Sequence, residues 1–174
     1  MANNKHKSTI QLQLQQMTEV DLEIFDSIAN VIHSQLQERP DVFQEKFRLF
    51  PAGCRIFCLG EHTLGYGIAH PWLLNNIPPL DTLLVSLPES PECLFIHDVV
   101  LLPEGRGHGA AGVYVDEMRI IARQSGLSSL ALVSVYGTSP LWAALGFQVI
   151  DHPDLAQKLM CYGDTARYMA NYLN

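Results

Sequence analysis

Apolar and polar residues follow two different periods along this chain. Residues 10–15 alternate strictly between apolar and polar side chains, which predicts a strand at the start of the domain. Residues 18–36 place apolar side chains three and four positions apart and begin with Thr18, a suitable N-cap, so they predict a helix. Pro40 stands where a second, shorter helix would begin, because proline is favoured at the first helical position.

The middle of the chain predicts a hairpin followed by a long connection. Two apolar runs bracket Gly60-Glu61-His62, a pattern typical of two strands joined by a tight turn. The proline-containing segment 71–91 holds more apolar residues than a linker would carry. We therefore expect a packed loop over the sheet, with no more than a short helical turn. Loops of this length in a compact domain are often functional.

Strands and helices alternate in the second half of the chain. The apolar run 94–101 predicts a strand, residues 107–124 an amphipathic helix and residues 130–136 a further strand. Another strand begins at Phe147, whereas the pattern does not fix the type of element within residues 155–174. Strands on both sides of a helix, with helices first and a hairpin beside them, predict a mixed α/β or α+β fold.

The length of 174 residues suits one domain with a full core. We place that domain at residues 10–174, after a polar, disordered tail over residues 1–9. Residues 127–150 carry no charge, but glycine, proline and serine interrupt them. A buried strand and a short helix therefore explain this run better than a membrane span. We expect no membrane partner, and the polar N-terminus, without a signal peptide, predicts a cytoplasmic location.

Charge and cysteine content restrict the partners further. The formal net charge of −7 argues against nucleic acid as a main partner and mildly favours a cationic acceptor. Cys54 and Cys58 would share one face of a strand, but about 13 Å apart, which is too far to share a metal ion. We expect buried free thiols in a reducing cytosol, and no combination of residues predicts a metal site.

The most informative segment is the turn between the strand at 94–101 and the helix that follows it. This turn, Arg106-Gly-His-Gly-Ala-Ala-Gly112, has almost no side-chain bulk apart from Arg106 and His108. Small residues let a ligand approach the backbone, and the free N–H groups at a helix start favour an anion. Such a site most often holds a phosphate or pyrophosphate, and a helix start that binds nothing is the alternative.

The glycines of this turn also match a dinucleotide-binding fingerprint. Gly107, Gly109 and Gly112 have the required spacing, and a strand and a helix flank them, but the fingerprint also needs an acid about 20 residues further on. The next strand ends at Tyr136 without an Asp or Glu. A P-loop is excluded because no Lys-Ser or Lys-Thr pair closes the turn. A nucleotide-dependent oxidoreductase remains an alternative that a comparison of NAD with coenzyme A would decide.

Two segments together resemble the GCN5-related N-acetyltransferases (GNAT family). Arg106-x-x-Gly109-x-Ala111, after a strand that ends Leu101-Leu102-Pro103, is similar to the family's acetyl-coenzyme A signature. Residues 139–147, Ser-Pro-Leu-Trp-Ala-Ala-Leu-Gly-Phe, are similar to its short helix and following Gly-Phe strand start. The resemblance covers roughly residues 54–150. It implies the GNAT-like acyl-CoA N-acyltransferase fold: a mixed, mostly antiparallel sheet of six to seven strands flanked by about four helices, with two parallel central strands that splay apart.

The resemblance also implies acetyl-CoA as the cosubstrate, with no metal. Main-chain groups of Val99, Val100 and Leu101 would bind the pantetheine arm and the acetyl carbonyl, although a plain core strand suits these side chains equally well. Backbone N–H groups of the turn and the helix start would hold the pyrophosphate. The residues expected there are Arg106, Gly107, His108, Gly109, Ala110, Ala111 and Gly112.

Two polar residues, His97 and Asp98, interrupt the apolar strand and, as neighbours, would face opposite sides of the sheet. An imidazole with a pKa of about 6.5 is suited to accept a proton at neutral pH. His97 also matches the face on which some relatives carry a carboxylate base. It is a candidate base, and a structural or substrate-orienting role is the alternative. Asp98 would hold an ammonium acceptor or a neighbouring backbone turn.

Trp142 is a departure from the family pattern, since many relatives place a tyrosine at this position, four residues before the Gly-Phe step. Indole could orient or cover the thioester but has no useful acidity, and a plain core role is the alternative. The thiolate would leave unassisted, or another group such as Tyr136 would protonate it. His70 would line the acceptor pocket or lie exposed in a turn. Glu38 would lie near the acceptor site, with a solvated surface charge the safer expectation.

These features predict an N-acetyltransferase that transfers the acetyl group of acetyl-CoA directly to a primary amine, because no motif offers a Cys or Ser nucleophile. The acceptor could be a small amine, an antibiotic, an amino acid or a protein amine, and a homodimer is left open. The alternative from another class is a catalytically degenerate module that binds an acyl-CoA as a sensor or supports a partner.

Overall fold

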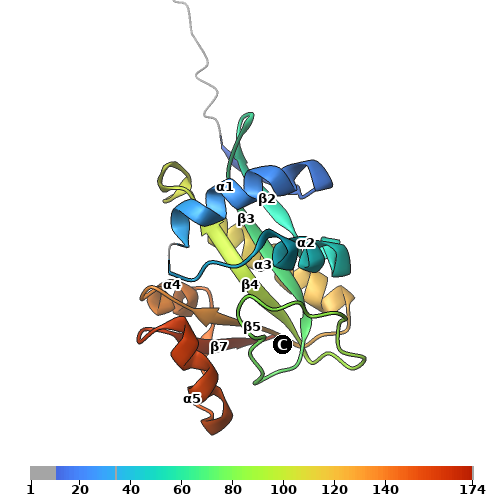
Figure 1. The fold of residues 1–174 in the computed structure, drawn as a ribbon, viewed down its shortest axis with the longest axis vertical. Coiled ribbons are helices and arrows are strands. Elements are labelled where there is room, and N and C mark those ends of the chain that lie inside the picture. The colour runs from blue at the N-terminus through green and yellow to red at the C-terminus, as the bar shows by residue number, and fades with distance from the viewer. Residues whose placement is uncertain (1–10, 34, 174) are drawn as a thin grey trace, which may run out of the picture.

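A seven-stranded sheet forms the centre of the computed structural model, which describes residues 11–33 and 35–173 (Figure 1). The strand order is β1-β2-β3-β4-β5-β7-β6, and the pairings are antiparallel except for the parallel pair β4–β5. The strands are β1 (Leu12–Gln16), β2 (Arg55–Leu59), β3 (His62–Trp72), β4 (Cys93–Leu101), β5 (Ser129–Ser134), β6 (Gln148–Val149) and β7 (Arg167–Tyr172). The predicted tail at residues 1–9 lies outside the described residues.

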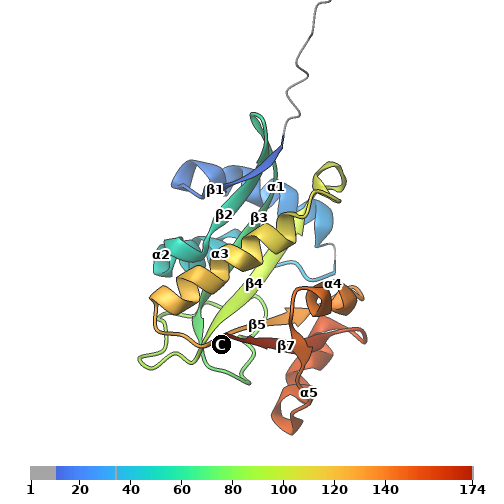
Figure 2. The same ribbon diagram turned by 180° about the vertical axis from the view of Figure 1, so that it is seen from behind.

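Helices cover both faces of this sheet. Figure 1 shows α1 and α2 in front of the strands, and Figure 2 shows α3 across the opposite face. The described residues form α1 (Leu22–Ile32), α2 (Pro40–Leu49), α3 (Ala110–Gln124), α4 (Ser139–Ala144) and α5 (Pro153–Leu159), with 3-10 turns at Glu19–Asp21, Pro51–Gly53, Pro103–Gly105 and Met160–Tyr162. Within the described part, no helix is long and apolar enough to cross a bilayer.

The core follows from the periodicity of α3. Its residues Val115, Met118 and Ala122 are fully buried and form one stripe at helical spacing, as the sequence predicted. This stripe packs on Leu94 and Ile96 of β4 in the main apolar cluster. Burying such side chains stabilises the fold by about 1.5–3 kcal/mol for each large one. A second cluster lies between β2, β3 and the helices α1 and α2 on the other face.

The predicted elements are present, with shifted ends. The first helix ends at Ile32 rather than near Leu36. The helix expected from residue 107 begins at Ala110, because Gly109 before it has a left-handed φ of 72°. The segment between β3 and β4, residues 73–92, consists of bends and turns and contains no helix. We call this segment the β3–β4 loop.

The parallel strands β4 and β5 part from each other along their length. Their registered pairs are Leu94–Leu130, Phe95–Ala131 and Ile96–Leu132, and β4 then continues to Leu101. Beyond Ile96, the edge of β4 that paired with β5 therefore has no strand of the described residues beside it. This is the splay of two central parallel strands that the family resemblance implied, and it opens the sheet from the edge nearest the start of α3.

A β-bulge at His97 changes which way β4 faces. Asp98 pairs with Ile68 while Ile96 pairs with the next residue of β3, so His97 is the additional residue on β4. Before the bulge the even-numbered Leu94 and Ile96 contact α3, and after it the odd-numbered Val99 and Leu101 belong to the same cluster. The bulge therefore places His97 and Asp98 on one face, although simple alternation predicted opposite faces.

The four cysteines are free thiols that differ in their burial. Cys54, Cys58 and Cys93 are buried free thiols, and burial raises the pKa of the Cys54 thiol to about 12. Cys161 is exposed, because it lies in a short 3-10 turn at the surface. The prediction of buried free thiols is therefore confirmed for Cys54 and Cys58, the pair for which it was made.

Candidate active site

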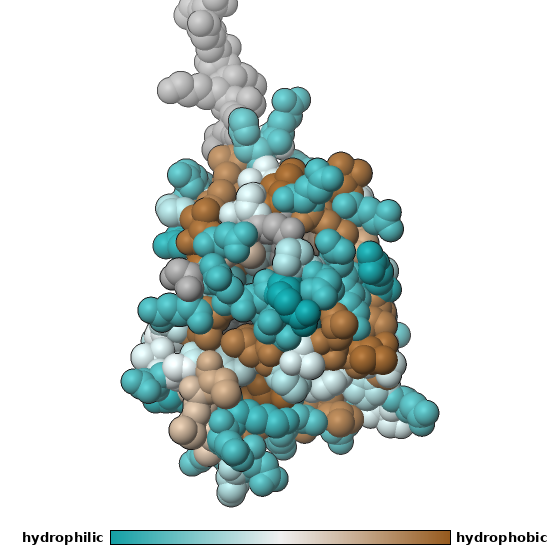
Figure 3. Space-filling model, in the orientation of Figure 1, coloured by the Kyte–Doolittle hydropathy of each residue, from teal (hydrophilic) through white to brown (hydrophobic). Residues whose placement is uncertain are grey.

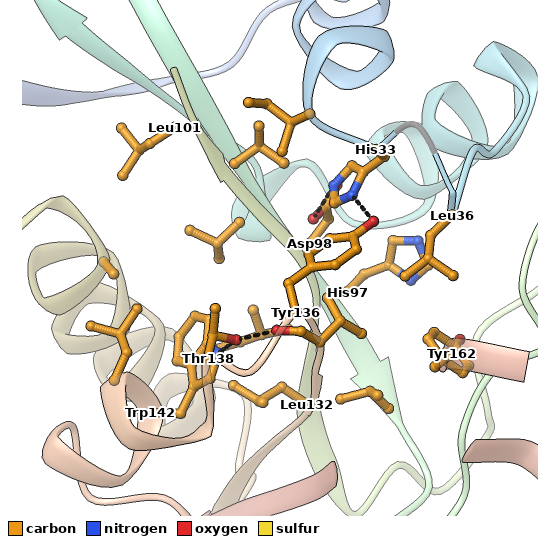
Figure 4. Close-up of a pocket in the computed structure, with 18 of the residues that line it drawn as sticks. His33, Leu36, His97, Asp98, Leu101, Leu132, Tyr136, Thr138, Trp142 and Tyr162 are labelled. Atoms are coloured by element: carbon orange, nitrogen blue, oxygen red, sulfur yellow. Dashed lines mark hydrogen bonds and ion pairs between the residues drawn. The ribbon is translucent and has the colours of Figure 1, made fainter. Parts of the chain in front are cut away.

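A cavity of about 490 Å³ lies where β4 and β5 part. Its walls come from both strands, from α1, α2, α3 and α4, and from the β3–β4 loop (Figure 4). In that view, Leu101 and Trp142 lie on one side of Asp98, and Leu36 and Tyr162 lie on the other. The cavity therefore has two ends, one near the start of α3 and one near the segment between α1 and α2.

The end near α3 is shaped by the glycine-rich turn. Gly107 and Gly109 have positive φ angles of 80° and 72°, and no other atom lies within 4 Å of where a Cβ would stand. Arg106 lines the cavity, and its Nε donates to the Leu101 carbonyl at 3.4 Å. This open backbone before a helix is suited to an anion.

The other predicted residues of this turn take several positions. Ala111 lines the cavity, and His108 is exposed beside the turn. Ala110 is buried in the core, and a side chain at Gly112 would contact Leu145 of the α3–α4 packing at 3.5 Å. Ala110 and Gly112 could thus serve a ligand through their main-chain groups alone.

Residues of β4 form the floor between the two ends. Val99, Val100 and Leu101 all line the cavity, in the part of the strand that has left β5. Here β4 pairs with β3 on one side only, and the free edge of such a strand presents unpaired N–H and C=O groups in an extended row. That row is what a linear, amide-containing ligand would require.

Glu38 and His97 form a buried pair at the far end. Nε2 of His97 lies 2.7 Å from Oε2 of Glu38, and the two side chains are 4% and 6% exposed. Burial alone would raise the pKa of Glu38, but the charge and hydrogen bond of His97 and the charge of Lys46 lower that pKa to about 2. Glu38 is thus ionised and buried. The expectation of a solvated surface charge was wrong, because the Glu38 side chain points inward to His97 and to the Asp81 N–H.

The pairing fixes the tautomer of His97. An ionised carboxylate can only accept, so His97 donates from Nε2, and Nδ1 is the nitrogen that can exchange a proton with a ligand. His97 also lies edge-on to Phe43, with ring centroids 6.1 Å apart. The imidazole is therefore held in one orientation by a carboxylate on one side and an aromatic ring on the other.

A second imidazole, His33, meets Asp98 in the middle of the cavity (Figure 4). His33 Nε2 lies 3.0 Å from Asp98 Oδ2, which also accepts from the Tyr66 hydroxyl at 2.8 Å. Burial alone would lower the pKa of His33, but the hydrogen bond and charge of Asp98, with the charge of Glu38, raise it. Asp98 thus already has partners within the protein, and His33 retains a proton more readily than an ordinary histidine.

Sequence reasoning missed His33. It follows the last residue of α1, and no motif or spacing connects it with Asp98, 65 positions away. The one available signal was its proximity in sequence to Glu38, in a connection that the fold brings over β4.

Tyr136 completes this cluster from the loop after β5. Its hydroxyl lies 3.3 Å from His33 Nδ1, and the two rings stack with centroids 5.9 Å apart. The residue has a φ of 54°, which is uncommon for a bulky side chain. Burial, followed by the charge of Asp98, raises the pKa of its phenol.

Trp142 lines the cavity from α4 and is 8% exposed. Its indole N–H donates to Thr138 Oγ1 at 3.2 Å, and its ring lies edge-on to Phe147 at 5.8 Å. Both the covering role and the core role that the sequence suggested are compatible with this position.

His70 is buried in β3 rather than exposed, and it is not among the cavity-lining residues, so both readings of it were wrong. The strand continues through Pro71 to Trp72, and Nδ1 of His70 lies 3.1 Å from the Pro71 carbonyl. Burial, followed by the charge of His97, lowers the pKa of His70 to about 3. His70 is therefore a neutral core histidine whose ring centroid lies 5.9 Å from that of His97.

No group of three or more His, Cys, Asp or Glu side chains arranged for a metal ion occurs among residues 11–33 and 35–173. Two histidine–carboxylate pairs line the cavity, Glu38 with His97 and Asp98 with His33. The arrangement is suited to moving protons between bound organic groups.

Several solved structures have a similar fold, each at a low sequence identity to this chain. The chain superimposes on Ard1 from Thermoplasma volcanium with a TM-score of 0.70 and 13% identity, over 95% of this chain and 99% of that one. The loading GNATL domain of CurA from Lyngbya majuscula superimposes with a TM-score of 0.70 and 14% identity, over 92% of this chain and 96% of that one. Arabidopsis thaliana Naa50 in complex with the bisubstrate analogue CoA-Ac-MVNAL superimposes with a TM-score of 0.68 and 10% identity, over 92% of this chain and 97% of that one. No protein-family model and no curated protein matches the sequence.

The chain therefore has the GNAT acyltransferase fold, as the two motifs predicted. The seven strands agree with the expected six to seven, and five α-helices in the described residues exceed the expected four. The dinucleotide alternative is not compatible with this sheet, since a Rossmann domain has a largely parallel sheet and here a single pair is parallel.

Proposed function

We propose that this protein is an acetyl-CoA-dependent N-acetyltransferase that transfers the acetyl group directly to a primary amine. The observation that carries the proposal is the opening between β4 and β5, which runs from the bare glycine turn to two histidine–carboxylate pairs. An anion site beside Arg106 and Ala111, the free edge of β4 and the proton-accepting groups would then share one cavity.

The coenzyme would occupy the end near α3. The N–H groups that begin this helix, with the Arg106 guanidinium beside them, would hold the pyrophosphate. The pantetheine arm would lie along Val99, Val100 and Leu101 and pair with their main chain as β5 does further back. The thioester would then reach the bulge at His97.

The transfer needs a base for the acceptor ammonium. His97 would accept the proton on Nδ1, because Glu38 holds the other nitrogen protonated and stabilises the resulting imidazolium. The freed amine would attack the thioester carbon, a C–N bond would form, and the C–S bond would break with its electron pair left on sulfur. Asp98 would act on His33 rather than on the acceptor, since its oxygens already have partners.

The departing thiolate would take a proton from Tyr136. The raised pKa keeps this phenol protonated at neutral pH, and His33 next to it can return the proton from Nδ1. Indole is not acidic enough for this step, so Trp142 would cover the thioester instead.

Release of free thiol from acetyl-CoA with a panel of primary amines tests this function. His97→Ala should lower kcat about 100-fold or more near neutral pH, and less at a pH where the amine loses its proton unaided. His62→Ala, at an exposed position in the β2–β3 hairpin, is the matched control and should leave the rate unchanged. A pH-independent effect of His97→Ala would remove it as the base. Tight acetyl-CoA binding without turnover of any amine would favour the sensor instead.

A further inference from the structure

The cavity end farthest from α3 is closed on the α2 side by hydrogen bonds to the β3–β4 loop. The Asp81 N–H donates to Glu38 Oε1 at 2.8 Å, and the Arg39 N–H donates to Asp81 Oδ1 at 2.7 Å. The Glu45 carboxylate then accepts from the N–H groups of Leu84 and Val85 at 2.6 and 2.9 Å. The loop is therefore joined to the α1–α2 connection and to α2 itself.

The same loop is also tied to the opposite flank, formed by α5 and the 3-10 turn after it. Lys158 Nζ donates to Asn76 Oδ1 at 2.6 Å and to the Ile77 carbonyl at 3.2 Å. The Tyr162 hydroxyl donates to the Pro78 carbonyl at 3.1 Å. With hydrogen bonds on both flanks, the loop forms one wall of this end of the cavity.

The outer side of the loop itself is not polar, since Leu83 and Val85 are exposed there, and polar side chains gather instead on the neighbouring α1–α2 connection. Figure 3 shows hydrophilic side chains gathered at the centre of the outer face, over the α1–α2 connection and the start of α2. On the inner face, Leu80 of the loop lines the cavity. The other apolar and aromatic side chains at this end are Ile32, Leu36, Phe43, Phe95 and Tyr162.

The charges at this end are already compensated. Glu38 is paired with His97 and Asp98 with His33, so neither carboxylate is left without a partner. Among the described residues that line the cavity, Arg106 is the sole arginine or lysine, and it lies at the α3 end. A carboxylate on the acceptor would thus be buried without a cation, which is strongly unfavourable.

We infer that the acceptor is a compact primary amine with an apolar body and no carboxylate, such as a branched alkylamine. The inference rests on the proposed transferase function and names its substrate class. Free amino acids are disfavoured by the missing cation. Peptides and proteins are disfavoured because the β3–β4 loop, hydrogen-bonded on both flanks, lies across this end of the cavity where a longer chain would continue.

Three acceptors with the same branched side chain separate these classes. 3-Methylbutylamine should have a kcat/KM on the order of 100-fold or more above that of leucine, which adds only the carboxylate. It should exceed a leucine-initiated tripeptide amide by a similar factor, because that peptide adds length without a carboxylate. Turnover of leucine or the peptide as fast as that of the alkylamine would overturn the inference and leave the transferase function intact.

A charge-introducing variant tests the site directly. Leu80→Arg should reduce the preference for 3-methylbutylamine over leucine at least about tenfold, because the new guanidinium would meet the carboxylate. Leu83→Arg, on the same loop but exposed and outside the lining, is the control and should not change it. An unchanged preference in Leu80→Arg would contradict the placement of the acceptor.

Calorimetry in the presence of coenzyme A separates the acceptor class from the transferase function. 3-Methylbutylamine should bind and leucine should not. Binding in this order without any thiol release would refute the transferase yet keep the ligand class, and equal binding of both would refute the class.

Discussion

Gly109 is under two constraints that act together. Its φ of 72° lies in the left-handed region, and the space beyond its Cα is open, so no packing explains the absence of a side chain. A bulky residue there would strain the backbone by about 1–2 kcal/mol and would also occupy the approach to the first N–H groups of α3. The residue therefore serves both the fold and the proposed phosphate site.

Gly109→Val should raise the KM for acetyl-CoA about tenfold or more, because the phosphates could no longer reach the backbone, and tenfold corresponds to about 1.4 kcal/mol. Gly126→Val is a matched control at the other end of α3, with a φ of 73° and equally open surroundings. Both variants should lose similar stability in thermal unfolding, but Gly126→Val should keep its KM. Equal KM values for the two variants would argue against phosphate binding at Gly109.

Single residues were predictable from the sequence where the backbone itself carries the role. The glycine turn was predicted from local composition, and Val99–Leu101 were predicted from the family resemblance. The side-chain partners were not found, because Glu38 and His33 reach β4 from 59 and 65 positions away. Their pairing depends on where the α1–α2 connection crosses the sheet, and no local pattern records that.

The bulge divides β4 into two segments. Even-numbered residues face α3 before it, and odd-numbered residues face α3 after it. Its additional residue, His97, permits apolar side chains on the α3 face both before and after it. A regular strand of the same sequence would turn either Leu94 and Ile96 or Val99 and Leu101 away from α3.

A matched pair of length variants in a Glu38→Gln background, which avoids an unpaired buried charge, tests this account. Deletion of His97 should keep both apolar sets on the α3 face. Insertion of an alanine after Asp98 would turn Val99 and Leu101 away if the bulge is kept, or turn Asp98 into the apolar cluster if the strand becomes regular. Either arrangement should cost about 3 kcal/mol more in urea unfolding than the deletion. Insertion and deletion variants of equal stability would contradict the account.

Elements were predicted better than their details. The stripes of α1, α2 and α3 and the hairpin β2–β3 follow from periodicity, which a sequence displays directly. The bulge was not visible, because two adjacent polar residues in an apolar strand fit simple alternation equally well. The β3–β4 loop was expected to pack over the sheet, but its ties to α2 and α5 join residues far apart in the chain.

The whole molecule should be less stable at pH 5 than at pH 7. The pKa of His70 is lowered from 6.5 to about 3, so below pH 6.5 the unfolded chain takes up a proton that the folded protein does not. This costs about 2 kcal/mol at pH 5. His33, whose pKa is raised, acts in the opposite sense: its contribution is present below pH 6.5 and is lost as the pH rises through its folded pKa.

Urea unfolding at pH 5 and pH 7 measures this difference, and His70→Gln, which does not titrate, should remove most of the loss at pH 5. Glu38, with a pKa lowered from 4.5 to about 2, adds a separate loss of stability only below about pH 4.5. An unchanged pH dependence in His70→Gln would show that other groups cause it.

At the scale of the whole molecule, the strand order was available from the sequence only through the family resemblance. Periodicity predicts strands but not their neighbours, and β7 inserts between β5 and β6 although it is last in the chain. Such pairings are set by the packing of the assembled core.

The parting of β4 from β5 leaves the sheet as two half-sheets, β1–β4 and β5–β7–β6, held edge to edge by three registered pairs. A bound pantetheine would lie between the two half-sheets. It would form hydrogen bonds with the backbone groups of β4 that have no partner in β5 beyond Ile96. The rigidity of the two halves relative to each other would accordingly depend on whether the coenzyme is in place, so each catalytic cycle would stiffen and loosen the molecule along this line.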